Sequence, residues 1–329
     1  MRNIRLRLAA LLASGGLALA FFSCRTSPPD AAGVARRKPT GSRSEPVKID
    51  PQVGLTREDW PKTPQRQASF MPFGVYWAGE HLWKTDNKEL DWDRIDASLK
   101  NLAAHHCNAV WLTHRSAVET AEFARRAARH GIYVVASIAH LAGEVPHIRK
   151  GNHEKLIKDT FAGWGDSPPP IAWGLGDEPR TSYMGEMKAY VDAWKKHAPG
   201  EPVTTVVMWR DLDAAGTCGF DALACDIYPF FSAGNPHGYG RSARDIWLSS
   251  GVNLVRQPGT GWIMGQAYQE PWGPWELDDR GNIVYLPGGA PHWGMPSPAQ
   301  MRWQAWATMA IGGKGVFSFL YRWPAKEGK

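Results

Sequence analysis

The residues with the clearest chemical potential in this 329-residue chain lie in the segment 173–179, Trp-Gly-Leu-Gly-Asp-Glu-Pro. Asp177 and Glu178 directly follow a short apolar run, so we expect them just past the end of a strand. A carboxyl group in an apolar, Trp-lined pocket loses hydration, which raises its pKa and keeps it protonated near neutral pH. Glu178 is therefore a candidate proton donor. Asp177 could orient it, bind a hydroxyl group or cap the following helix, because carboxylates are also favoured at helix N-termini.

The elements that must position these residues follow a regular alternation from Phe70 onward. Segments with apolar residues at helical spacing alternate with short apolar runs, which predicts a parallel sheet covered on both faces. Eight such units predict a (β/α)8 TIM barrel over residues 67–329, without room for a final helix before Lys329. No GxGxxG motif follows the first strand, and no cofactor is expected. The predicted strands are 72–77, 108–113, 132–138, 170–176, 203–208, 221–227, 261–268 and 314–320, and the predicted helices are 92–105, 116–130, 152–163, 183–198, 242–256 and 298–311.

In this fold the active site is built at the C-terminal ends of the strands and in the loops that follow them. The predicted strand ends carry aromatic, acidic and hydrogen-bonding side chains. This mixture suits carbohydrate, because sugars present C–H faces to aromatic rings and hydroxyls to polar groups, although polar strand ends occur in any barrel. The candidate sugar platforms are Trp77, Trp209, Tyr228, Tyr268 and Trp272, and the candidate hydroxyl partners are His114, Asp226, Gln266 and Arg322.

Four segments carry a resemblance to a known group of enzymes: 174–179 (GLGDEP), 221–229 (DALACDIYP), 262–269 (WIMGQAYQ) and 301–323. In this order they resemble the (β/α)8 glycoside hydrolases of the clan that includes family 42 β-galactosidases and cellulase-like enzymes, and secreted bacterial proteins with a strand-four DEP motif. The resemblance implies a glycosidase with Glu178 as general acid/base. It also implies a second carboxylate at the end of strand seven, the nucleophile of retaining enzymes.

At the end of strand seven the sequence departs from that pattern. The inward position is Gln266 or Tyr268, and the first carboxylate is Glu270. A Glu270 carboxyl ~5–5.5 Å from that of Glu178 would allow a retaining mechanism, and one at ~6.5–9.5 Å an inverting mechanism. The Asp177-Glu178 pair also resembles that of family 20 hexosaminidases, in which the acetamido group of the substrate replaces the nucleophile.

Two further classes of function stay open. A surface glycan-binding protein on a degenerate barrel would explain the missing nucleophile. A metal-dependent hydrolase would need His114, His140 and Asp226 to converge on one metal ion, although no metal-binding motif is present.

The N-terminus predicts export. Arg2, Arg5 and Arg7 precede an apolar run over residues 8–22, and Ser23-Cys24 follows. This resembles a bacterial lipoprotein signal, which implies lipidation of Cys24 and anchoring in the bacterial cell envelope. An ordinary cleaved signal would leave the protein periplasmic or secreted. Residues 25–66, rich in Pro, Arg, Ser and Thr, are expected to form a flexible linker.

Charge and cysteine content narrow the function further. The net charge is +6, but residues 1–66 hold 12 Lys/Arg and 5 Asp/Glu, so the remaining chain holds 26 and 27. A neutral barrel gives no reason to expect nucleic-acid binding. Beyond Cys24 only Cys107, Cys218 and Cys225 remain, which is no disulfide framework and favours buried free thiols.

Eight of the 17 tryptophans fall into two predicted groups. The loop 269–297 holds Trp272, Trp275 and Trp293 and is predicted to contain a β-hairpin over 276–285. Long loops at the catalytic face of a barrel are often functional. The tryptophans on predicted helices are expected to pack against the barrel; they are Trp92, Trp194, Trp247, Trp303 and Trp306.

Overall fold

The computed structural model describes residues 70–77, 90–112, 116–137, 152–232, 242–280 and 282–321. All of them belong to the second of two units of the chain, residues 49–329. The predicted signal with Cys24 and the predicted linker 25–66 lie outside the described residues. Among the helices that are described, none is long and apolar enough to cross a membrane.

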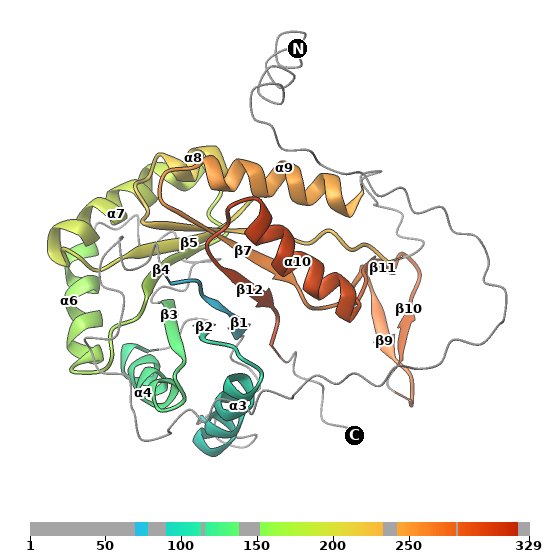
Figure 1. The fold of residues 1–329 in the computed structure, drawn as a ribbon, viewed down its shortest axis with the longest axis horizontal. Helices are drawn as coiled ribbons and strands as arrows, with labels where there is room; N and C mark the ends of the chain where they lie inside the picture. The colour runs from blue at the N-terminus through green and yellow to red at the C-terminus, as the bar shows by residue number, and fades with distance from the viewer. Residues whose placement is uncertain are drawn as a thin grey trace, which may run out of the picture. The chain divides into compact units, whose positions relative to one another are not determined.

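Eight parallel strands close into a barrel (Figure 1). Their order around the barrel is β1-β12-β7-β6-β5-β4-β3-β2, and β1 pairs with β2 to close it. The structure thereby confirms the (β/α)8 prediction, and every predicted strand is found within two residues of its predicted ends. The strands are β1 (Phe73–Trp77), β2 (Ala109–Leu112), β3 (Tyr133–Ser137), β4 (Ala172–Asp177), β5 (Val203–Met208), β6 (Ala222–Ile227), β7 (Thr260–Gln266) and β12 (Val316–Phe319).

A helix lies in each of the seven connections between consecutive barrel strands. The helix α8 (Leu212–Gly216) was not predicted, because five residues are too few to show a helical period. After β12 the described chain continues only to Tyr321. The other helices are α3 (Trp92–Ala104), α4 (Ala117–Ala128), α6 (His153–Trp164), α7 (Met184–His197), α9 (Ala243–Arg256) and α10 (Pro298–Ala310).

The barrel is filled by large side chains from strands that are not neighbours. Trp111 on β2 contacts Trp262 on β7 at a ring-centroid distance of 6.0 Å, and both rings contact Phe317 on β12. Because β2 and β7 are not adjacent in the sheet, these rings meet inside the barrel. Each buried aromatic side chain contributes about 2 to 3 kcal/mol to folding.

A second core lies between the barrel and its helices. Trp173 on β4 packs against Trp164 on α6 and Trp194 on α7, with ring centroids 4.8 and 5.4 Å apart. Trp247 on α9 packs against Trp303 on α10 in the same way, at 5.3 Å. The packing role predicted for these helix tryptophans is confirmed.

Trp306 is the exception among the helix tryptophans, because its side chain is 68% exposed. The buried residues of α10 are Gln304 and Thr308. Trp306 lies two residues from each, and a step of two residues reaches the opposite side of a helix. The prediction that Trp306 packs against the barrel is therefore wrong.

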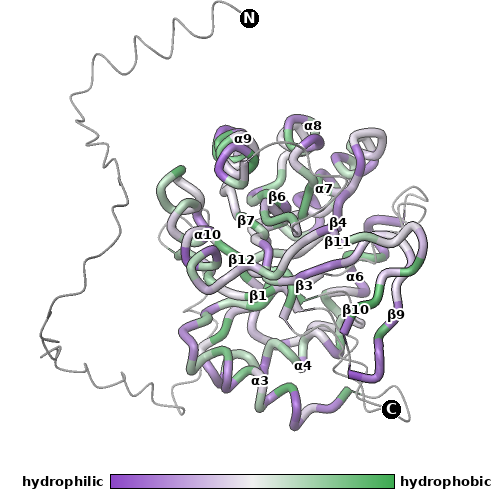
Figure 2. Tube along the Cα trace, turned by 90° about the vertical axis from the view of Figure 1, so that its right-hand side faces the viewer, coloured by the Kyte–Doolittle hydropathy of each residue, from purple (hydrophilic) through white to green (hydrophobic). Residues whose placement is uncertain are grey.

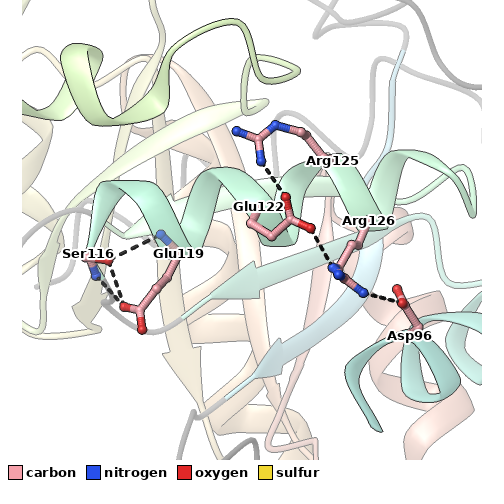
Figure 3. Close-up of polar contacts among 6 residues, drawn as sticks. All are labelled: Asp96, Ser116, Glu119, Glu122, Arg125 and Arg126. Carbon is pink, nitrogen blue, oxygen red and sulfur yellow. Dashed lines mark hydrogen bonds and ion pairs between the residues drawn. The ribbon is translucent and has the colours of Figure 1, made fainter. Parts of the chain in front are cut away.

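Polar contacts fix the beginning of α4 and join it to α3 (Figure 3). Ser116 and Glu119 form a capping box, in which each side chain accepts a hydrogen bond from the other's backbone N–H. Further along α4, Arg126 pairs with Glu122 on the same helix and with Asp96 on α3. These contacts hold the two helices that follow β1 and β2 side by side.

The three cysteines of the described chain are free thiols, as predicted. Cys218 and Cys225 are buried and Cys107 is half-buried. Burial raises the pKa of the Cys225 thiol well above its usual value. A thiol in that state is unreactive, and we assign all three to packing.

Between β7 and α10 the chain forms a two-stranded antiparallel ribbon over residues 270–293, here called the ribbon. It contains the predicted hairpin, now seen as β9 (Trp275–Leu277) and β10 (Ile283–Tyr285), and at its base β8 (Glu270–Trp272) pairs with β11 (Ala290–Trp293). A hydrogen bond of 3.1 Å from Leu286 N to Pro274 O connects the two pairs. In Figure 1, β9 and β10 extend away from the barrel.

Candidate active site at the barrel mouth

The end of β4 contains a bulge that turns a carboxyl group into the barrel. Gly174 pairs with Thr204 and Asp177 with Val206, so β4 advances by three residues over a length in which β5 advances by two. One extra residue reverses the alternation of side chains, and Asp177 therefore shares the inward direction of Val206. Gly176 occupies the bulge because a Cβ atom there would lie 2.7 Å from Thr205 Oγ1.

Glu178 follows the bulge with a backbone φ of 49°, in the left-handed region that few non-glycine residues adopt. Such a conformation costs about 1 to 3 kcal/mol and persists only where the surroundings enforce it. The Glu178 N–H donates to Val206 O at 2.9 Å. Three residues on, Thr181 donates from its N and Oγ1 to Oδ1 of the buried Asp211, at 2.9 and 2.6 Å. These bonds hold the chain on both sides of Glu178.

Asp226 on β6 completes a group that we call the carboxyl cluster: Asp177, Glu178 and Asp226. The Asp226 and Glu178 side chains share a hydrogen bond, and the charge of Asp177 acts on Asp226 as well. Tyr76 on β1 donates its hydroxyl to Asp177, and Tyr228 donates to Asp226. Three carboxyl groups from two strands thus meet inside one end of the barrel.

Burial and mutual repulsion keep protons on the carboxyl cluster. The pKa of Asp226 lies well above its usual value because the group is buried, and because Glu178 accepts its hydrogen bond and repels its charged form. The pKa of Asp177 is raised to about 6 by burial and by the charge of Glu178, against the opposing effect of the Tyr76 hydrogen bond. Asp177 and Asp226 therefore hold their protons to a higher pH than isolated aspartates do.

Aromatic rings line the barrel beside the cluster and form what we call the aromatic wall: Tyr76, Tyr228, Tyr268, Trp293 and Phe319. Tyr228 lies 5.1 Å from Tyr268 and 5.8 Å from Trp293, measured between ring centroids. Phe319 joins Tyr268 to Tyr76 at 5.3 and 5.2 Å. The structure brings the predicted Tyr228 and Tyr268 beside the carboxyl cluster. Tyr76, Trp293 and Phe319 were not among the predicted contacts.

Trp77 does not reach the mouth, and its predicted role as a sugar platform is wrong. Its side chain is 0% exposed and packs against Phe123 of α4 and Tyr321, with both centroid distances 5.1 Å. Neighbouring residues on a strand point to opposite faces of the sheet. Trp77 therefore faces the helices while Tyr76 faces the interior, and this alternation is the signal by which Tyr76 could have been selected.

Gln266 was predicted to bind a sugar hydroxyl, and this prediction is also wrong. Its side chain is 0% exposed. Its Oε1 accepts from Phe230 N at 2.9 Å, and its Nε2 donates to Phe230 O and Gly294 O at 3.0 and 2.8 Å. Both donor hydrogens are used, so Gln266 fastens the loop after β6 and the chain leaving the ribbon to the end of β7.

Glu270, the predicted second carboxylate, lies at the base of the ribbon, opposite Trp293 and exposed. Partial burial of its carboxyl group raises the pKa of Glu270, and neither Glu178 nor Asp226 contributes to this shift. The carboxyl groups that interact with Glu178 among the described residues are Asp177 and Asp226. A catalytic role for Glu270 stays a prediction.

Of the other predicted sugar contacts, Trp209 and Trp272 belong to the described residues. The side chain of Trp209 after β5 is 57% exposed and that of Trp272 on the ribbon 51%, so both rings are open to a ligand. His114 and Arg322 lie outside the described residues, as does His140 of the predicted metal trio. Within the described part of the chain, no three His, Cys, Asp or Glu side chains are placed to hold a metal ion.

Comparison with known proteins gives structural matches only. No protein-family model and no curated protein matches the sequence. The chain is similar to a β-galactosidase from the psychrophilic Marinomonas ef1 (TM-score 0.54, 13% identity, covering 77% of this chain and 54% of that one). It is similar to GH5_18 from Bifidobacterium longum subsp. longum (TM-score 0.52, 13% identity, covering 79% of this chain and 72% of that one).

A third similar structure is the β-glucuronidase from Ruminococcus gnavus in complex with D-glucuronic acid (TM-score 0.52, 14% identity, covering 76% of this chain and 42% of that one). The chain thus spans less than half the length of that glucuronidase. At such low identity the likeness establishes the fold alone. This chain therefore shares its barrel with TIM-barrel glycoside hydrolases.

Proposed function

We propose that this protein is a glycoside hydrolase that acts on an oligosaccharide or polysaccharide, with Glu178 as general acid/base. The observation that carries this proposal is the carboxyl cluster beside the aromatic wall, in which burial and mutual repulsion raise the pKa values of Asp177 and Asp226. The fold shared with TIM-barrel glycoside hydrolases supports it.

The geometry suggests how the bond is broken. The proton shared by Glu178 and Asp226 passes through Glu178 to the glycosidic oxygen as the bond from that oxygen to the anomeric carbon breaks. The Asp177 carboxylate stabilises the positive charge that develops on the sugar ring. Water then adds to the anomeric carbon and returns a proton to the Glu178–Asp226 pair. General acid catalysis of this kind contributes about 10²- to 10⁴-fold.

We further propose that no covalent bond forms between the sugar and the end of β7. Gln266, at the position where the nucleophile is expected, is an amide whose hydrogen bonds are fully used within the protein. Incubation with an aryl glycoside followed by rapid acid quenching should therefore give the unmodified protein mass. A sugar adduct on Glu270 would instead restore the retaining mechanism.

One observation favours substrate assistance as the second candidate. The bulge of β4 turns Asp177 into the barrel directly beside Glu178, where it could orient an acetamido group of the substrate. In that case N-acetylhexosaminides would be hydrolysed faster than the corresponding hexosides. Equal rates for the two would remove this candidate.

The test of the main proposal is turnover by the full chain against a panel of aryl glycosides and polysaccharides. Glu178→Gln keeps the size of the side chain and removes the acid, so hydrolysis should fall at least ~10²-fold while the melting temperature is retained. The matched control is Glu154→Gln, an exposed glutamate of α6, which should leave turnover unchanged. Unchanged turnover in Glu178→Gln would contradict the assignment. Binding of a glycan by the wild-type chain without any turnover would favour the non-catalytic alternative.

A further inference from the structure

The ribbon presents a row of apolar and aromatic side chains on one face. In β9 and β10, Trp275 pairs with Tyr285 and Leu277 with Ile283. Side chains two residues apart on a strand share a face, as do directly opposed residues of an antiparallel pair. These four side chains therefore lie on one face, and Trp275 and Tyr285 are 44% and 40% exposed.

A series of ring contacts connects the ribbon to the carboxyl cluster. Trp293 belongs to the aromatic wall and lies 4.0 Å from the His292 ring, which in turn lies 5.1 Å from the exposed ring of Trp272. Trp272 ends β8 and Trp275 begins β9, with only Gly273 and Pro274 between them. Packed rings, with the buried His292 among them, thus connect the barrel mouth to the exposed Trp272 of the ribbon.

The charge of the ribbon restricts what can lie on it. The described ribbon residues include four carboxylates, Glu270, Glu276, Asp278 and Asp279, and one cation, Arg280. The carboxyl cluster adds further negative charge at the mouth. This excess of negative charge disfavours a polyanion, whereas an uncharged chain would not be repelled. Figure 2 shows the tip between β9 and β10 as hydrophilic, which suits hydroxyl-rich ligands.

We propose that the ribbon is a distal binding site for an uncharged glycan chain that extends outward from the barrel mouth. Trp272 and the Trp275–Tyr285 pair are its stacking platforms. The enzyme then binds several consecutive sugars of a chain rather than one terminal sugar. This inference rests on the proposed function for the class of ligand, but it is tested by binding and not by turnover.

The experiment measures the affinity of the full chain, in the Glu178→Gln background, for four probes: laminarin, xylan, mannan and polygalacturonate. The bound neutral polymer is then replaced by its own oligosaccharides of two to six sugars. We expect binding of at least one neutral polymer, none of polygalacturonate, and affinity that rises with chain length. The double variant Trp275→Ala/Tyr285→Ala should weaken hexasaccharide binding at least about fivefold and disaccharide binding less.

Two control variants separate stacking from damage to the fold. Trp275→Phe keeps a ring and should retain most of the affinity, while Trp306→Ala removes an even more exposed tryptophan from α10 and should change nothing. Unchanged hexasaccharide affinity in the double variant would overturn the proposal, as would equal binding of polygalacturonate. A double variant that alters sedimentation but not glycan affinity would also overturn it and assign the ribbon to self-association.

The outcomes distinguish this inference from the proposed function. If aryl glycosides are hydrolysed but no polymer binds, the ribbon proposal fails and the hydrolase proposal stands. If the ribbon binds a neutral chain but no glycoside is hydrolysed, the ribbon proposal stands and the hydrolase proposal fails.

Discussion

The ends of β4 and β7 lie at the same mouth of the barrel but are built in opposite ways. At β4 a bulge and a left-handed residue bring Asp177 and Glu178 together, and burial and the charge of Glu178 raise the pKa of Asp177 to about 6. At β7, Gln266 is fully buried and makes hydrogen bonds to the backbone of two other segments. One strand end holds groups whose charge can change, and the other holds an amide whose charge cannot.

This difference indicates that the end of β4 is built for chemistry and the end of β7 for stabilising the fold. Strained backbone and poorly solvated carboxyl groups lower stability, and they cluster where a protein uses them. A buried side chain with every hydrogen bond satisfied adds stability and keeps the surrounding loops in position. The comparison predicts that substitutions at the two strand ends will change stability in opposite directions.

The largest effect is expected for Gln266→Glu. A carboxylate at this position would face the carbonyl oxygens of Phe230 and Gly294 without a hydrogen to donate to either. We expect the free energy of unfolding at pH 7 to fall by about 3 kcal/mol, measured by chemical denaturation, because Phe230 N–H would be the one donor left for a buried charge whose second oxygen faces two carbonyl oxygens. No gain in hydrolysis should accompany the loss.

The matched control is Gln300→Glu, in the capping box of α10, where glutamate serves as well as glutamine. Its free energy of unfolding should change by less than about 0.5 kcal/mol. If Gln266→Glu were as stable as the wild-type chain and gained activity, the end of β7 would be a catalytic position and the comparison would be wrong.

A smaller effect, of opposite sign, is expected for Asp177→Asn. The folded-state pKa of Asp177 is about 6, above its unfolded value, so the folded state binds the proton more tightly. The wild-type chain therefore loses stability as pH rises from about 4 to about 6, and the loss is complete above that range. The amide removes this loss. At pH 8 the free energy of unfolding of the variant should therefore exceed that of the wild-type chain by about 1 to 2 kcal/mol, whereas at pH 4 the two should be equal.

Denaturation curves at several pH values test this prediction for Asp177. Asp159→Asn, an exposed carboxylate of α6 paired with Lys155, is the control and should not alter the pH dependence in this window. A wild-type stability that stays flat between pH 4 and 6 would show that Asp177 is not desolvated by the fold.

Much of the fold follows from patterns that the sequence displays directly. The strands and most helices could be predicted because apolar runs and helical periods are local properties. The short α8 could not, since it spans little more than one turn. Trp306 was assigned to packing from its helix alone, but the side that faces the barrel is set by tertiary contacts.

The candidate site was predictable in its residue types and less so in its geometry. Glu178 and Asp177 were identified because they follow an apolar run. Their partner Asp226 was predicted as a sugar contact or a metal ligand and not as a partner of Glu178, because its meeting with Glu178 depends on the bulge and on barrel closure. Gln266 was misassigned since its hydrogen-bond partners lie more than 25 residues away along the chain.

The central claim is that the carboxyl cluster holds a proton at neutral pH for transfer to a substrate. The most direct test is a ¹³C NMR titration of the aspartate and glutamate side-chain carboxyl carbons between pH 3 and 9. We expect one aspartate signal to titrate well above the usual aspartate range and to vanish in Asp226→Asn, and a second to titrate near pH 6 and to vanish in Asp177→Asn. If every aspartate in the wild-type chain titrates below about pH 5, the cluster holds no proton and the account is contradicted.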